Sequence, residues 1–214
     1  MASKAYNLWS SSGKMASLRY GHVAVHLLDG KVLVAGGRTK NDDDSSITNS
    51  AELYNPDTEI WASIPTNMNI KRADFTAALL PDGRVLVIGG RLPTREVTPT
   101  TEIYDPYTKR WLLGASMNYA RTNPLGEEAL QFEDGTIMVV GGDTLGTSEI
   151  YTPTPTTGIW GPAHRLPSPH YLGATASLKN GQAFVAGGFD VHDLSTDDKS
   201  KINAWTELYV PGSE

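Results

Sequence analysis

The chain has 214 residues, no cysteine, and a formal charge of −6 that results from 18 Lys and Arg against 24 Asp and Glu. The lack of cysteine excludes disulfides, thiolate metal sites and a cysteine nucleophile, and the acidic balance argues against non-specific nucleic-acid binding, which requires a basic surface. No apolar run approaches the ~18 residues of a membrane-spanning helix, and the 21 glycines indicate many tight turns.

The first twenty residues contain no apolar stretch of the length found in secretory signals. Lys4, Lys14 and Arg19 precede the first acidic residue, Asp29, a composition that faintly resembles an organelle transit peptide. The same segment also fits the repeat described next, and we therefore expect a cytoplasmic protein.

Four repeats of about fifty residues follow one another along the chain. Each contains an Asp-Gly or Asn-Gly dipeptide, a mainly apolar run that ends in two glycines, a variable stretch and a Glu-x-Tyr segment, and a Trp follows in the first three. The glycine pairs are Gly36-Gly37, Gly89-Gly90, Gly141-Gly142 and Gly187-Gly188, and the tryptophans are Trp61, Trp111 and Trp160.

Each part of this repeat predicts a β-strand. Asp-Gly and Asn-Gly are typical of type I′ hairpin turns, and the run after the turn, such as Val32-Leu33-Val34-Ala35, is apolar enough to be covered on both faces. The Glu-x-Tyr segment predicts a third strand, and the Trp begins a fourth. Four strands per repeat, with no helical periodicity, predict an all-β propeller in which every repeat forms one blade.

The repeat resembles the Kelch repeat in its double glycine, in Glu-x-Tyr-(Asn/Asp)-Pro, and in the Trp seven residues after the Tyr of the first two repeats. The resemblance extends from about Trp9 to Tyr209 and implies a single Kelch-type β-propeller domain, residues 1–214, with four four-stranded blades. The repeats span approximately residues 10–61, 62–111, 112–160, and 161–214 plus 1–9. The third repeat departs from the pattern by two extra residues before its Trp.

The two ends of the chain are predicted to complete one another. The fourth repeat has no Trp after Tyr209, and Trp9 has no Glu-x-Tyr before it, so we expect the strand around Trp9 to close the last blade and cover its edge. Kelch propellers usually have five to seven blades, and four are few. The chain could close alone, pair with a second copy as a ring of eight, or belong to a longer protein; closure, alone or as a homodimer, is favoured.

Binding residues are expected in the loops, because the strands of a propeller supply a rigid frame. One loop set follows the glycine pairs, and the other joins each Trp strand to the next hairpin; in the Kelch family both lie on one face. Ten residues after each Trp stand Arg19, Lys71, Arg121 and His170, next to Tyr20, Arg72 and Tyr171 in three of the four cases. Arg38 and Arg91 directly follow their glycine pairs.

These side chains predict a cationic ring on one face, suited to an acidic peptide or to a carboxylate or phosphate ligand. A competing interpretation is that the basic residue repeated after each Trp braces a neighbouring blade through the repeated Glu of Glu-x-Tyr. For Arg38 and Arg91 the competing interpretation is an exposed loop charge.

The sequence favours a non-enzymatic protein-interaction scaffold that binds an acidic peptide or protein, without cofactor, metal ion, nucleic acid or membrane. Some propellers that resemble Kelch proteins are copper radical oxidases or sugar epimerases, but the oxidase cofactor needs a Tyr–Cys crosslink and this chain has no Cys. A carbohydrate-binding or sugar-modifying, epimerase-like propeller is the alternative. Two acidic segments, Asp42-Asp43-Asp44 and the group Asp190, His192 and Asp193, could hold a cation, but without EF-hand spacing we interpret them as solvated loops.

Overall fold

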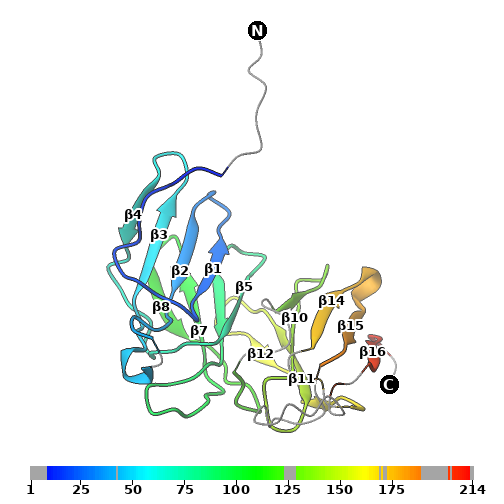
Figure 1. Cartoon of the computed structure of the whole chain (residues 1–214). Coiled ribbons are helices and arrows are strands. Elements are labelled where there is room, and N and C mark those ends of the chain that lie inside the picture. Colours follow the sequence, from blue (N-terminus) through cyan, green and yellow to red (C-terminus); the bar gives the residue numbers. More distant parts are fainter. Residues whose placement is uncertain are drawn as a thin grey trace.

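The computed structural model describes residues 9–41, 43–122, 129–168, 170, 173–188, 202 and 204–212. Its strands form four antiparallel sheets, which confirms the predicted all-β blade architecture (Figure 1). Two single-turn 3₁₀ helices, η1 (Asp44–Ser46) and η2 (Lys179–Gly181), lie in the described ranges. None of the helices among these residues is long and apolar enough to cross a membrane.

Every blade is a meander whose strands run outward in chain order from the centre of the molecule. Blade 1 contains β1 (Val23–His26), β2 (Val32–Ala35), β3 (Ala51–Asn55) and β4 (Ile60–Ser63). Blade 2 contains β5 (Thr76–Leu79), β6 (Val85–Ile88), β7 (Thr101–Asp105) and β8 (Arg110–Leu113). Blade 3 contains β9 (Leu130–Gln131), β10 (Ile137–Val140), β11 (Thr147–Thr152) and β12 (Ile159–Trp160), with β13 (His164–Arg165) also paired to β11. Blade 4 contains β14 (Ala174–Ser177), β15 (Ala183–Ala186) and β16 (Thr206–Tyr209).

The Asp-Gly and Asn-Gly dipeptides form the hairpins between the first two strands of each blade, as predicted, but the turn type differs. In the first three blades only the glycine has positive φ, for example 83° at Gly30, and the preceding aspartate does not. This is a three-residue loop that ends in a left-handed glycine rather than a type I′ turn. Asn180 and Gly181 in blade 4 both have positive φ (66° and 74°), so the predicted pair of left-handed residues occurs there.

The glycine pairs end each second strand where the backbone passes the linker to the next blade. The amide of Gly37 donates to the carbonyl of Arg72 (2.9 Å), and that of Gly90 donates to the carbonyl of Arg121 (2.7 Å). A Cβ on Gly90 would lie 2.8 Å from the carbonyl oxygen of Ala73. The residue lacks a side chain because two chain segments approach too closely for one.

Neighbouring blades pack through two different faces, because alternate residues of a strand point to opposite sides. We call the face that carries the Tyr of Glu-x-Tyr the Tyr face, and the face that carries the residue between Glu and Tyr the Leu face. Leu33 on the Leu face of blade 1 packs in one cluster with Val85, Tyr104 and Trp111 on the Tyr face of blade 2. Blades 2 and 3 and blades 3 and 4 repeat the arrangement, so the core lies between blades rather than inside one sheet.

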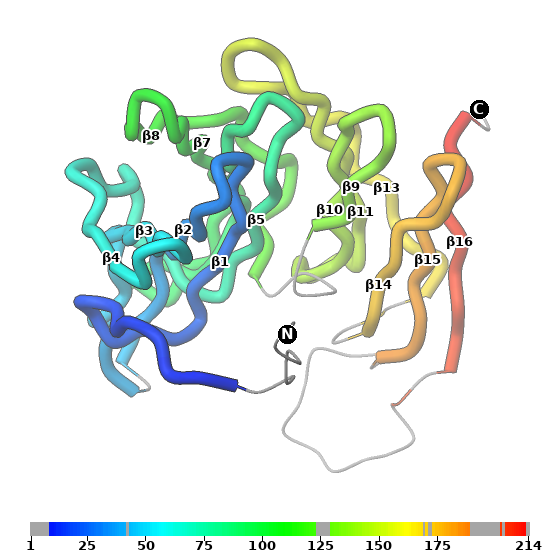
Figure 2. Tube along the Cα trace, turned by 90° about the horizontal axis from the view of Figure 1, so that it is seen from above, coloured from blue at the N-terminus to red at the C-terminus, as the bar shows by residue number. Residues whose placement is uncertain are grey.

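The blades follow one another around an arc, with blade 1 and blade 4 at its two ends (Figure 2). The expected closure of blade 4 by the N-terminal strand is not found among the described residues, where its sheet has three strands. Residues 9–20 instead run along blade 1, where Trp61 Nε1 donates to the carbonyl of Gly13 (3.0 Å) and the amide of Ala16 donates to Glu52 (2.7 Å). Trp9 itself is fully exposed.

The buried tyrosines give a first prediction. Tyr104 and Tyr151 hold the same repeat position and are both buried, but Tyr151 donates its hydroxyl to the carbonyl of Thr157 (3.0 Å), whereas the Tyr104 hydroxyl has no partner. We expect Tyr104→Phe to leave the free energy of unfolding at pH 7 within about 0.5 kcal/mol, and Tyr151→Phe to lower it by about 1 kcal/mol. Urea denaturation measures both, and equal losses would contradict this account.

Ionisation of Tyr104 makes the stability of the protein depend on pH. Burial, followed by the charges of Asp105 and Asp29, raises the pKa of Tyr104 from 10.0 to about 12. The unfolded chain releases the phenol proton near pH 10 and the folded chain only near pH 12, so the free energy of unfolding is unaffected below pH 10 and falls as the pH rises from 10 to 12. Over that range wild type should lose roughly 1.4 kcal/mol per pH unit relative to Tyr104→Phe.

Candidate interaction face

The two predicted loop sets meet on one side of the blades. Tyr20 pairs with Arg38 and Ala73 pairs with Arg91 in isolated β-bridges, each joining the segment before a hairpin to the loop after a glycine pair. Thr122 Oγ1 donates to the carbonyl of Asp74 (3.0 Å), which links blade 3 to blade 2 on the same side. We call this surface, formed by residues 17–22, 37–41, 43–50, 70–75, 90–100 and 117–122, the loop face.

The basic residue repeated after each Trp strand is buried beneath the loop face. Arg72 has no exposed surface and donates from Nη1 to the carbonyls of Gly89 (2.6 Å) and Thr100 (2.9 Å) and from Nη2 to Glu102 (3.1 Å). Glu102 also accepts the amide of Ile70 (2.9 Å). Burial lowers the pKa of the Arg72 guanidinium, although the charge of Glu102 and its hydrogen bond oppose this shift.

The arrangement recurs in the other blades with the repeated glutamate as acceptor. Arg19 lies 2.7 Å from Glu52, and Arg121 lies 2.7 Å from Glu149. Each of the two arginines also donates to the carbonyl of the first glycine of its pair, Gly36 or Gly141. Each arginine thus braces the glutamate of its own repeat, not that of a neighbouring blade, and its guanidinium is buried beneath the loop face.

The pattern differs in blade 4 and in the second linker, the segment that joins β4 of blade 1 to β5 of blade 2. His170 takes the arginine position, with Nδ1 2.6 Å from the carbonyl of Gly187 and Nε2 3.2 Å from Glu207. In the second linker the equivalent residue is Arg72, eleven residues after its Trp, and Lys71 at the counted position is exposed. Tyr171 lies outside the described residues.

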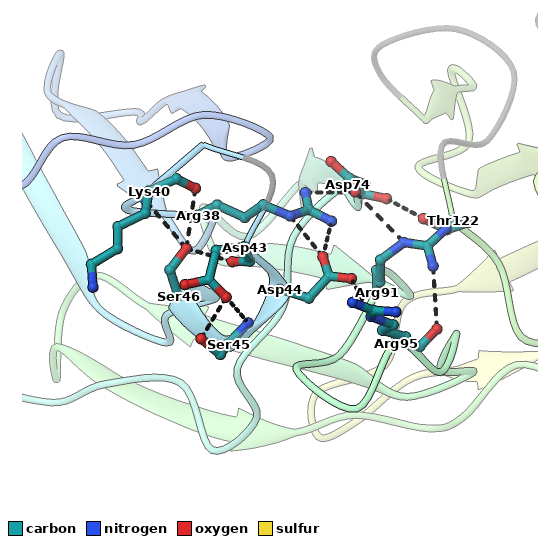
Figure 3. Close-up of polar contacts among 10 residues, drawn as sticks. All are labelled: Arg38, Lys40, Asp43, Asp44, Ser45, Ser46, Asp74, Arg91, Arg95 and Thr122. Carbon is teal, nitrogen blue, oxygen red and sulfur yellow. Dashed lines mark hydrogen bonds and ion pairs between the residues drawn. The ribbon is translucent and has the colours of Figure 1, made fainter.

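Arg38 is the centre of an ion-pair cluster in the loop face (Figure 3). Its guanidinium lies 2.7 Å from Asp44 and 2.7 Å from Asp74, and it stacks over the ring of Tyr20 at 5.6 Å from the centroid. Burial disfavours the charge of Arg38, but the hydrogen bonds and attraction of the two carboxylates outweigh it and raise the pKa of the guanidinium. With a side chain only 8% exposed, Arg38 organises the loops and offers little surface to a partner.

The exposed cations of the loop face are farther from the same two carboxylates. Arg91 Nε lies 4.0 Å from Asp74, with 34% of its side chain exposed, and Arg95 Nε lies 3.7 Å from Asp44, with 82% exposed. Arg91 Nη1 donates to the carbonyl of Arg95 (3.2 Å), which holds the two residues together. These distances exceed those of a direct hydrogen bond, so neither guanidinium is hydrogen-bonded directly to a carboxylate of the cluster.

The acidic run that could have held a cation has a structural role. Asp43 caps η1 by accepting from the amide of Ser45 (2.9 Å), and Asp44 is engaged by Arg38. No metal-binding group of three His, Asp or Glu residues occurs in the part of the chain that the structure describes. Asp42, Asp190, His192 and Asp193 lie outside it.

Sequence reasoning missed the carboxylates that set the charge of the loop face. Asp44 belongs to the acidic run that is interpreted above as a solvated loop, and no repeat pattern points to Asp74 or Arg95. In the sequence Asp74 lies two residues after Arg72, and only the fold brings it to Arg38 across the two blades.

A family model described as the Kelch motif matches residues 19–68 and 74–118. Kelch-like protein 35 of Homo sapiens is 30% identical over 69% of this chain, and beta-scruin of Limulus polyphemus is 26% identical over 93% of it. The chain belongs to the Kelch-repeat family.

The match to relatives is partial in length. This Kelch-repeat chain spans 24% of Kelch-like protein 35 and 22% of beta-scruin. Among solved structures, that of YjhT superimposes with a TM-score of 0.64 at 16% identity, over 91% of the Kelch-repeat chain and 69% of YjhT. This likeness supports the propeller fold.

Proposed function

We propose that the chain is a non-enzymatic scaffold and that a protein partner docks on its loop face through acidic residues. Kelch-repeat proteins in general bind protein partners. The proposal rests on Arg91 and Arg95. They lie on the loop after Gly89-Gly90, Arg91 donates to the carbonyl of Arg95, and neither guanidinium is hydrogen-bonded directly to a carboxylate of the cluster. A carboxylate matches such a pair because it accepts two N–H groups at once.

The local charge supports an acidic partner although the whole chain is acidic. The cluster drawn in Figure 3 contains four cations, Arg38, Lys40, Arg91 and Arg95, against three carboxylates, Asp43, Asp44 and Asp74. The carboxylates engage Arg38 and the loop backbone at short range. Glu96, exposed beside Arg95, adds a fourth carboxylate to this loop. The exposed cations Lys40, Arg91 and Arg95 therefore face one exposed carboxylate, and an acidic partner can neutralise the two arginines.

Fluorescence anisotropy with labelled peptides rich in Asp and Glu tests this proposal. We expect saturable binding that weakens at least tenfold in the double variant Arg91→Glu/Arg95→Glu, because each charge-assisted hydrogen bond contributes about 1.5–3 kcal/mol. The matched control is Arg110→Glu, an exposed arginine on β8 away from the loop face. Equal affinity of the double variant and the control would contradict the proposal.

The sugar-binding alternative is separated by a thermal-shift comparison. Stabilisation by glucuronate at modest concentration, with no stabilisation by acidic peptides, would assign the loop face to a carboxylated sugar instead. Stabilisation by acidic peptides alone supports the scaffold.

A further inference from the structure

Blade 4 ends the arc with an uncovered apolar Leu face. The residues on it are Ala174, Ala176, Phe184, Ala186 and Leu208, as the strand register places them opposite the Tyr face that packs on blade 3. Leu208 is 52% exposed, whereas Ile103, at the same repeat position in blade 2, is completely buried against blade 3. Blade 3 covers Ile103, and no sheet among the described residues covers Leu208 in the same way.

Blade 1 ends the arc with the opposite face. Its Tyr face carries Ala24, His26, Val32, Tyr54 and Trp61. Tyr54 and Trp61 are half-buried, whereas Tyr104 and Trp111, their counterparts in blade 2, are buried against blade 1. The two ends therefore present the two complementary halves of an interface that the molecule already builds three times.

Blade 4 has three described strands, and the segment around Trp9 matches the fourth, outermost strand that the other blades have. Gly13 accepts from Trp61 as Ala115 accepts from Trp160, both at 3.0 Å, and each acceptor is four residues after a Trp. Trp9 thus holds the position of an outermost-strand Trp, although it is fully exposed. Tyr209 on β16 lacks the Trp that lies 5.0–5.2 Å from the corresponding Tyr in the other three blades.

The geometry of the arc separates these matching groups within one chain. β1 packs against β5, and β14 packs against β9, while both figures place blades 1 and 4 at opposite ends. A second copy can bring a Tyr face to the free Leu face without bending the arc.

We propose that two copies of this chain associate head to tail, with the Leu face of blade 4 against the Tyr face of blade 1 of the second copy. The strand around Trp9 of that second copy adds antiparallel to β16, and its indole packs on Tyr209. The contact is heterologous, because it joins two different surfaces. This inference goes beyond the scaffold function and does not depend on the loop face.

Size-exclusion chromatography with light scattering on the full chain tests the association. We expect wild type to reach at least twice the chain mass of 23.1 kDa as concentration rises, and Leu208→Arg and Trp9→Ala to elute near 23.1 kDa with unchanged circular dichroism. The matched control is Leu112→Arg, a leucine with 50% exposure on an internal blade, which should keep the wild-type mass. Wild type at 23.1 kDa at every concentration would overturn the proposal.

A mixing experiment tests the head-to-tail direction. Leu208→Arg disables the Leu face of blade 4, and Ala24→Arg, at an exposed residue of β1, disables the Tyr face of blade 1. Each variant alone should be monomeric. In an equimolar mixture, the intact Leu face of the Ala24→Arg variant can pair with the intact Tyr face of the Leu208→Arg variant. The mixture should therefore form a dimer and no larger species. A mixture that stays monomeric while wild type associates would refute the head-to-tail arrangement.

Discussion

Replacing Arg72 with Ala is expected to lower the free energy of unfolding by about 3–5 kcal/mol. The guanidinium has no exposed surface and satisfies the carbonyls of Gly89 and Thr100 as well as Glu102. Removing it leaves the Glu102 carboxylate buried with amide donors alone, and leaves two buried carbonyls with one partner fewer. Urea denaturation at pH 7, analysed for both midpoint and slope, measures the loss.

Its neighbour provides the matched control. Lys71 is exposed, and Lys71→Ala should change the free energy of unfolding by less than about 0.5 kcal/mol. Arg72→Lys should remain clearly destabilised, because an ammonium cannot replace the planar fork that reaches several acceptors at once. A stable Arg72→Ala variant that loses affinity for acidic peptides would instead restore the cationic-ring interpretation.

The blade could be predicted from residue types, because its signals are local. Dipeptides such as Asp29-Gly30 mark the hairpins, and the apolar run before Gly36-Gly37 becomes a buried strand. The turn type could not be predicted, because it depends on the number of loop residues that the strand register leaves unpaired. The glycine takes positive φ in every hairpin, but the residue before it does so only at Asn180.

The spacing of the repeated arginine from its Trp does not predict whether its side chain is buried or exposed. Lys71 and Arg72 are adjacent, but one is exposed and the other is buried. Which of them turns inward depends on where the linker passes the glutamate of its own repeat, and this is set by packing between strands more than twenty residues apart. The sequence offers the pairing of a repeated Arg with a repeated Glu as one of two interpretations, and the structure shows that pairing. A binding role for the same arginines stays a prediction, which Arg72→Ala tests.

Trp9 illustrates a second limit of sequence reasoning. In the sequence Trp9 has no Glu-x-Tyr segment before it and Tyr209 has no Trp after it. The hydrogen bond from Trp61 to Gly13 supports the repeat position of Trp9. A repeat pattern states which surfaces match, but it does not state whether they belong to one molecule. That depends on the rotation between blades, which accumulates over the arc and separates the two residues.

The indole of Trp111 gives the second large expected effect. It is buried between blades 1 and 2, where its ring lies 5.0 Å from that of Tyr104, and Trp111→Ala should lower the free energy of unfolding by about 3–5 kcal/mol. Its Nε1 has no hydrogen-bond partner, so Trp111→Phe, which keeps an aromatic ring in the cluster, should lose less than half as much. Trp160→Phe also removes the hydrogen bond from Nε1 to the carbonyl of Ala115 (3.0 Å), which adds about 1 kcal/mol to its cost. Urea denaturation of the three variants separates the apolar contribution of the ring from the hydrogen bond, and equal losses for Trp111→Ala and Trp111→Phe would contradict the packing role of the ring.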